Sequence, residues 1–72
     1  MNGLTIETEQ EEDGRWIGEV MEIPGCLVYG STREEVIAKV KALALHVIAD
    51  RIDHGESIPA GFADVFQVAP MG

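Results

Sequence analysis

Basic residues are scarce in this sequence: its 72 residues hold five Lys plus Arg against thirteen Asp plus Glu, for a formal net charge of −8. Binding to nucleic-acid phosphates or to anionic lipid needs Lys and Arg gathered on one face, whereas these five are scattered. We therefore expect no direct contact with nucleic acid or membrane. Apolar runs also fall short of the roughly 18 residues of a membrane span, and the N-terminus lacks the pattern of a signal peptide, which predicts a cytoplasmic location.

Cysteine is scarcer still, since Cys26 is the single one. An internal disulfide is therefore excluded. The hydrophobic fraction of 46% and the charged fraction of 25% are those of a folded domain. We predict one domain over residues 1–72, with a core over about 4–68 and a frayed tail at 69–72. A core this small supplies about 3–5 kcal/mol, so we expect a homo-oligomer, a dimer or larger.

Residues able to carry chemistry are few. Cys26 has His46 and His54 as possible partners but no orienting Asn or Asp at a recognisable spacing, which favours a buried structural role. His46 and Asp50 stand four residues apart on a predicted helix, and two ligands do not make a metal site. The sequence therefore predicts no cofactor, no metal and no enzymatic activity of its own.

Alternation of apolar and polar residues predicts strands near the N-terminus. One strand is expected over 4–10, and the Asp13-Gly14 pair favours a tight hairpin turn into a second strand over 15–23. Pro24-Gly25 ends that strand, and a short third strand is expected over 26–29. After the helix described next, a loop over 56–61 leads to a last strand over 65–68.

A helix is predicted from about residue 32 to residue 53. Ser31 or Thr32 can cap its first turn together with a glutamate three residues later, and Gly55 supplies the left-handed residue that commonly ends a helix. The apolar stripe expected to pack on the sheet consists of Val36, Ile37, Val40, Leu43, Ala44, Val47 and Ile48. The predicted fold class is α+β: a single β-β-β-α-β domain whose antiparallel sheet is covered on one face by one helix.

Two predicted surfaces lie outside this core. The first, on and near the uncovered sheet face, combines apolar and acidic side chains and suits a protein partner: Ile17, Glu19, Met21 and Glu22. The second, on the helix side opposite the stripe, suits a second copy of the chain: Ala38, Ala42, Leu45 and Ala49. Two plainer interpretations stay open, namely acids that only aid solubility and alanines that only favour the helix beside one exposed leucine.

The stretch over residues 12–36 resembles the antitoxin domain of the HicB family. It carries a Glu-Asp-Gly hairpin at 12–14, an aromatic residue at Trp16, a Pro-Gly-Cys turn at 24–26 and the pattern Gly-x-Thr-x-Glu-Glu at 30–35. Valine stands at position 36, where the family usually has alanine. Residues 54–59 are also similar to the family, so the resemblance spans roughly residues 4 to 60.

The resemblance implies a degraded ribonuclease-H-like fold without activity of its own. Relatives bind and mask a small basic toxin of the HicA type that cleaves messenger RNA, and the excess of acid in this chain suits such a partner. Many relatives also carry a C-terminal DNA-binding segment, and we expect a short form without it. The leading hypothesis is therefore an antitoxin domain.

Two alternatives come from other functional classes. In one, the chain is an orphan structural domain that assembles only with itself and has no toxin partner. In the other, it is a hydrolase that retains ribonuclease-H-like chemistry, which needs acids clustered around two metal ions. The sequence pattern does not place such acids together.

Overall fold

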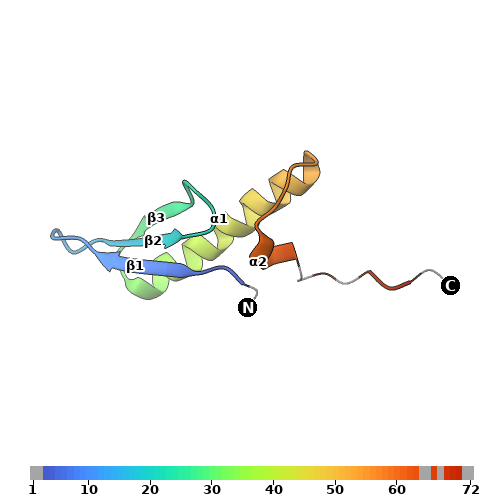
Figure 1. Ribbon diagram of the computed structural model, residues 1–72. Helices are drawn as coiled ribbons and strands as arrows, with labels where there is room; N and C mark the ends of the chain where they lie inside the picture. The colour runs from blue at the N-terminus through green and yellow to red at the C-terminus, as the bar shows by residue number, and fades with distance from the viewer. Residues whose placement is uncertain (1–2, 64–65, 67, 71–72) are drawn as a thin grey trace.

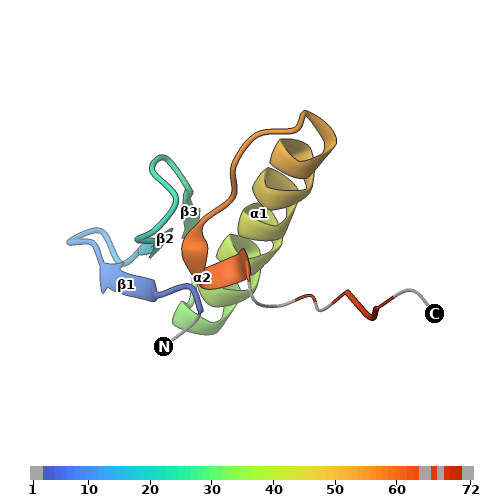
Figure 2. The ribbon, with the colours of Figure 1, turned by 45° about the vertical axis from the view of Figure 1, so that its right-hand side comes forward.

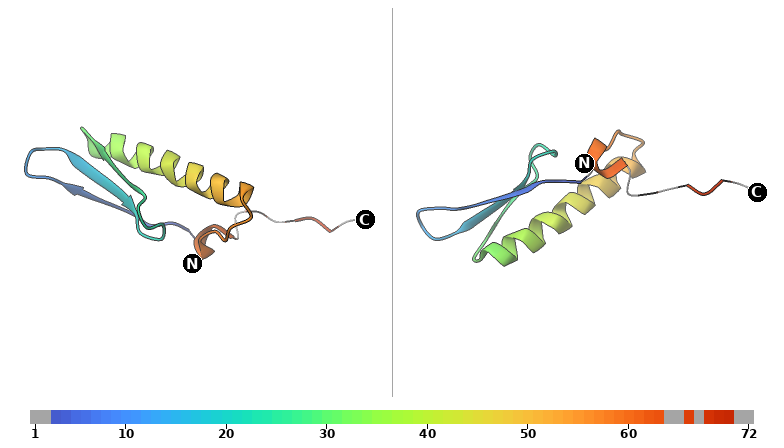
Figure 3. Two further views of the ribbon diagram at one scale, coloured as in Figure 1. Left: turned by 90° about the horizontal axis from the view of Figure 1, so that it is seen from above. Right: turned by 60° about the horizontal axis from the view of Figure 1, so that its bottom comes forward.

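The computed structural model describes residues 3–63, 66 and 68–70 (Figure 1). Three antiparallel strands, Ile6–Gln10 (β1), Trp16–Val20 (β2) and Leu27–Gly30 (β3), form a sheet in the order β1-β2-β3. They are followed by a long helix, Arg33–Asp53 (α1), and a short one, Ala60–Ala63 (α2). Figure 2 and Figure 3 show α1 lying across one face of the sheet. The predicted α+β class, with one helix covering one sheet face, is confirmed.

The predicted hairpin joins β1 and β2 through the Asp13-Gly14 pair. Gly14 has a φ of 92° and donates its N–H to the Glu11 carbonyl at 2.9 Å, while Glu11 N–H donates to the Arg15 carbonyl at 2.7 Å. The Asp13 carboxylate accepts from the backbone N–H of Arg15 at 3.1 Å and from its Nε at 2.9 Å. The backbone bond is the main cause that holds the pKa of Asp13 below its usual value. The turn is therefore closed by backbone and side chain together.

A reciprocal cap begins α1. Thr32 stands at the N-cap position, where its Oγ1 accepts from Glu35 N–H at 3.0 Å, and the Glu35 carboxylate accepts from Ser31 N–H at 2.9 Å. The Ser31 bond, followed by the charge of Lys39, lowers the pKa of Glu35. At the other end, Gly55 has a φ of 70° directly after the helix. Both predicted helix ends are confirmed, and the capping residue is Thr32.

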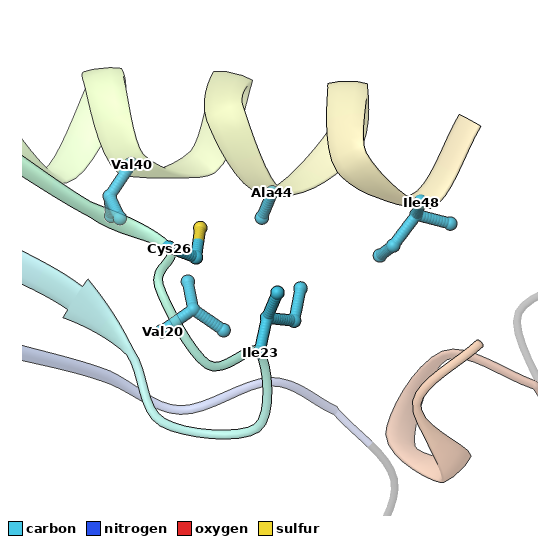
Figure 4. Packing of buried hydrophobic residues seen from close by; sticks show 6 residues of the cluster. All are labelled: Val20, Ile23, Cys26, Val40, Ala44 and Ile48. Atoms are coloured by element: carbon cyan, nitrogen blue, oxygen red, sulfur yellow. The ribbon is translucent and has the colours of Figure 1, made fainter. Parts of the chain in front are cut away.

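The core lies between α1 and the sheet. The predicted stripe is confirmed: four of its residues are buried and the other three are half-buried. Figure 4 shows the side chains that meet across this layer, which are Val20, Ile23, Cys26, Val40, Ala44 and Ile48. Val40, Ala44 and Ile48 are four residues apart and therefore lie on one side of α1, so each turn of the helix contributes one buried side chain.

β1 and β2 are shorter than predicted, and β3 has the predicted length but lies one residue later in the chain. β2 ends at Val20 because the chain turns at once: Ile23 N–H donates to the Val20 carbonyl at 3.2 Å, and Cys26 N–H donates to the Ile23 carbonyl at 3.0 Å. These local bonds replace sheet pairing over residues 22–25. They also direct Ile23 and Cys26 inward, where both are buried. Cys26 therefore belongs to the turn, and β3 starts at Leu27.

The C-terminal part also differs from the prediction. The expected loop over 56–61 is wrong at its end, where α2 begins at Ala60. Phe62 N–H donates to the Pro59 carbonyl at 2.9 Å, and a proline is tolerated there because the first N–H groups of a helix need no partner within it. Ile58 and Phe62 pack against the core. None of the helices within the described ranges is long and apolar enough to span a membrane.

The expected fourth strand falls on residues 65–68. Residues 65 and 67 lie outside the described part of the chain, as do 71 and 72 of the expected frayed tail. Phe66 and Val68 are described and are not in a strand. The described sheet therefore has three strands, and both β1 and β3 are edge strands.

Candidate protein-binding face

Strand register decides which side chains the uncovered side of the sheet presents. Gly18 and Val20 are buried beneath α1, so their neighbours in β2 point the other way. Ile17 pairs with Glu9 of β1 and Tyr29 of β3, and Glu19 pairs with Glu7 and Leu27. We call this surface the open face; it consists of Glu7, Glu9, Ile17, Glu19, Leu27 and Tyr29.

The half of the open face next to β1 is acidic. Three carboxylates, of Glu7, Glu9 and Glu19, lie around the half-buried side chain of Ile17. With Thr8 they line a hollow of about 300 Å³. The sequence predicted Ile17 and Glu19 as contact residues but did not place Glu7 and Glu9 beside them.

The half next to β3 is apolar. Leu27 is 39% exposed and Tyr29 is 46% exposed. The Arg15 guanidinium stacks 4.8 Å from the centre of the Tyr29 ring and also pairs with Asp13 at 2.9 Å. This basic group is therefore held at the margin of the open face, and the acidic half keeps its excess of negative charge.

Met21 and Glu22, the other two predicted contact residues, lie in the turn directly after β2. Met21 is 48% exposed. The Glu22 carboxylate accepts from the N–H and from the hydroxyl of Thr5, each at 2.8 Å. These bonds, the N–H bond first, hold the pKa of Glu22 below its usual value. Glu22 thus ties the turn to the chain just before β1, which is a structural role.

The small residues predicted for self-association lie on the exposed side of α1, away from the sheet. We call this surface the helix outer face; it consists of Ala38, Ala42, Leu45 and Ala49. Leu45 is 55% exposed, the largest apolar side chain of the four. The helix outer face and the open face lie on opposite sides of the domain.

The structure does not bring the candidate chemical residues together. Cys26 is buried in the core, and this burial raises the pKa of its thiol. His46 is exposed on α1, and His54, beyond its end, has its Nδ1 2.8 Å from the Asp50 carbonyl. Within residues 3–63, 66 and 68–70, no three His, Cys, Asp or Glu side chains lie close enough together to hold a metal ion.

Fold and site together define a small α+β domain with one sheet face covered by a helix and the other left open and acidic. The chain is 30% identical over 64 residues to a UPF0150 protein of Thermoplasma acidophilum, and the alignment covers 89% of this chain and 93% of that protein. The chain therefore belongs to the UPF0150 family. No family model and no solved structure matches it. Family membership by itself assigns no activity.

Proposed function

We propose that the chain is a HicB-like antitoxin domain of the cytoplasm, which binds and masks a small basic HicA-type toxin that cleaves messenger RNA. The observation that supports this function best is the open face, where three glutamates lie beside exposed apolar side chains. The domain acts by covering the toxin's RNA-binding surface. It needs no catalytic group, cofactor or direct contact with nucleic acid for this task.

The two halves of the open face suit different parts of such an interaction. The glutamates attract a basic protein over distance and exclude acidic ones, which speeds association at low salt. Leu27 and Tyr29 offer apolar surface that a partner would bury, and tyrosine is enriched at the centres of protein interfaces. A basic surface made to bind RNA phosphates has the charge that complements this face.

Charge reversal on the open face tests the proposal. Glu19→Lys should weaken binding of a HicA-type toxin at least tenfold at low salt, whereas Glu12→Lys, the same charge change in the exposed hairpin turn, should have little effect. Binding can be measured by calorimetry with toxin that co-purifies from the native host. Equal affinity of Glu19→Lys and the unmodified chain would contradict the proposal. Glu22 is unsuitable for this test because its carboxylate holds Thr5.

A second candidate, a self-assembling domain without a toxin, is favoured by the exposure of Leu45 on the helix outer face. Small alanines around one leucine permit close packing of two helices. Leu45→Glu should then lower the mass measured by light scattering, whereas His46→Glu, at the next exposed position of α1, should not. An unchanged mass for Leu45→Glu would remove this surface as an oligomer interface.

A further inference from the structure

The outer edge of β1 carries backbone groups without partners. Met21 N–H donates to the Thr5 carbonyl at 3.0 Å, and Glu11 N–H donates to the Arg15 carbonyl at 2.7 Å. The backbone N–H and C=O groups of the odd-numbered residues in this segment therefore point toward β2. By alternation, the N–H and C=O groups of Ile6, Thr8 and Gln10 point away from the sheet. Across the part of the chain that the structure describes, none of these groups has a hydrogen-bond partner.

The opposite edge, along β3, is partly closed. Leu27 N–H donates to the Gly25 carbonyl at 3.1 Å, and the Tyr29 carbonyl accepts from Lys39 Nζ at 3.3 Å. A lysine across an edge strand is a usual protection against unwanted pairing. β1 contains neither lysine nor proline. Of the two edges, β1 is therefore the one prepared to accept another strand.

The charges beside this edge select what can bind there. Glu7 and Glu9 project from β1 on the open-face side, directly beside the position of an added strand. On the other side of the sheet, Arg33 Nε donates to Thr8 Oγ1 at 3.1 Å, so positive charge already lies there. An added strand would therefore meet negative charge on the open-face side only. Basic side chains fit at alternate positions, all on that side.

A second copy of β1 does not meet this requirement. Antiparallel pairing of two β1 strands about Thr8 would place Glu7 of each copy opposite Glu9 of the other. Like charges directly opposite each other destabilise a strand pair. The glutamates thus oppose self-pairing at the same edge that they make attractive to a basic strand.

We propose that an extended basic segment of the partner adds to the sheet as a fourth strand along β1, with Lys or Arg at alternate positions beside Glu7 and Glu9. The backbone of this segment forms hydrogen bonds with the outward N–H and C=O groups of Ile6, Thr8 and Gln10. A lysine stem can lie over Ile17 in the hollow while its ammonium group meets the carboxylates at the rim. Strand addition of this kind is a general mode of peptide recognition. The identity of the partner as a toxin rests on the proposed function, whereas the edge and its chemistry do not.

Amide hydrogen exchange with a model peptide tests the proposal. The probe is a ten-residue peptide of alternating Lys and Thr, and its controls are an alternating Glu-Thr peptide and a block peptide of five Lys followed by five Thr. In the free chain, the amides of Ile6, Thr8 and Gln10 should exchange quickly. The alternating Lys-Thr peptide should slow them at least tenfold, and neither control should do so.

Two kinds of variant separate hydrogen bonding from charge. Thr8→Pro removes an outward N–H that the chain's own sheet does not use, and should abolish binding of the Lys-Thr peptide; Gln10→Pro serves if Thr8→Pro does not fold. Glu7→Gln combined with Glu9→Gln should weaken binding at least tenfold at low salt, whereas Glu12→Gln in the turn should leave it unchanged. Equal binding of the block and alternating peptides would overturn the strand model, since charge alone would then suffice.

The remaining outcomes keep this inference distinct from the antitoxin proposal. Slow exchange of the three amides in the free chain would overturn the inference, because the edge would already be occupied. A toxin that binds without protecting them would overturn strand addition and leave the antitoxin function supported. Binding and protection by the peptide, with no toxin recovered from the host, would support strand addition and count against the antitoxin function alone.

Discussion

Gly18 of β2 lies directly beneath Val36 of α1. A Cβ atom at position 18 would come within 3.1 Å of Val36 Cγ1, 3.2 Å of Cγ2 and 3.2 Å of the Val36 carbonyl oxygen. Most real Cβ contacts are longer than these, and one of the three atoms belongs to the helix backbone. The absence of a side chain at Gly18 therefore allows α1 to approach the sheet closely at this point.

Gly18→Ala should consequently destabilise the domain by about 1–3 kcal/mol, because the added methyl forces α1 away from β2. Urea denaturation followed by circular dichroism measures the change. Val36→Ala removes two of the three close contacts. Gly18→Ala should therefore cost less stability when it is added to Val36→Ala than when it is made in the unmodified chain. If Gly18→Ala is as stable as the unmodified chain, the close approach described above is wrong.

Thr32→Ala should lower the free energy of unfolding by about 1 kcal/mol, since Thr32 Oγ1 accepts the Glu35 N–H at the first turn of α1. Ser31→Ala provides the matched control, because the neighbouring hydroxyl makes no hydrogen bond among the described residues while the Ser31 N–H is unaffected. Thermal unfolding of both variants compares the two hydroxyls. Similar losses in both variants would show that Thr32 is not the cap.

Glu22 should make the stability of the folded domain sensitive to acid. Its pKa is lowered in the folded state by the Thr5 N–H and hydroxyl, so the stability it contributes is present above the unfolded-state value, about 4.3. That stability is lost as the pH falls from there through the lowered folded-state pKa. Glu22→Gln should therefore be less stable at neutral pH and show a shallower loss below about pH 4.3.

The control for Glu22→Gln is Glu12→Gln, which changes the net charge equally at an exposed position without a hydrogen bond in the described structure. Urea titrations at several pH values between neutral and acid provide the comparison. If stability falls as steeply with acid in Glu22→Gln as in the unmodified chain, the hydrogen bonds from Thr5 to Glu22 do not contribute to the acid sensitivity.

Cys26 should react slowly as long as the domain is folded. The side chain is 2% exposed and its burial raises the thiol pKa, so both access and thiolate formation are suppressed. A thiol reagent such as Ellman's should modify it much more slowly in buffer than in denaturing urea. Rapid modification of the folded chain would contradict the buried position and reopen a chemical role for this residue.

Much of the fold followed from local pattern. The hairpin at Asp13-Gly14, the cap near Thr32, the end at Gly55 and the apolar stripe of α1 depend on neighbours within a few residues, and all are confirmed. The turn over 21–25 was predicted too short, because its bonds from Ile23 and Cys26 compete with strand pairing in a way that periodicity does not reveal.

The candidate site was predicted less completely. Ile17 and Glu19 lie on the open face as expected, but the acidic half also needs Glu7 and Glu9, which only the β1-β2 register brings beside them. Glu22 was placed in the contact set, although its carboxylate turns to Thr5, seventeen residues earlier in the chain. Long-range pairing of this kind has no signature in local spacing.

By itself, the sequence determined what short-range physics controls: the negative charge, the approximate positions of β1, β2, β3 and α1, the caps of α1, and which side of α1 is apolar. Each of these depends on residue type and on spacing along the chain. Only the tertiary structure decided the strand register and the pairing of β3 with β2, where Glu7, Glu9 and Glu19 meet, and which edge is left unpaired among the described residues. Those features arise from contacts between residues far apart in sequence, whose geometry is set by packing against α1 rather than by any local preference.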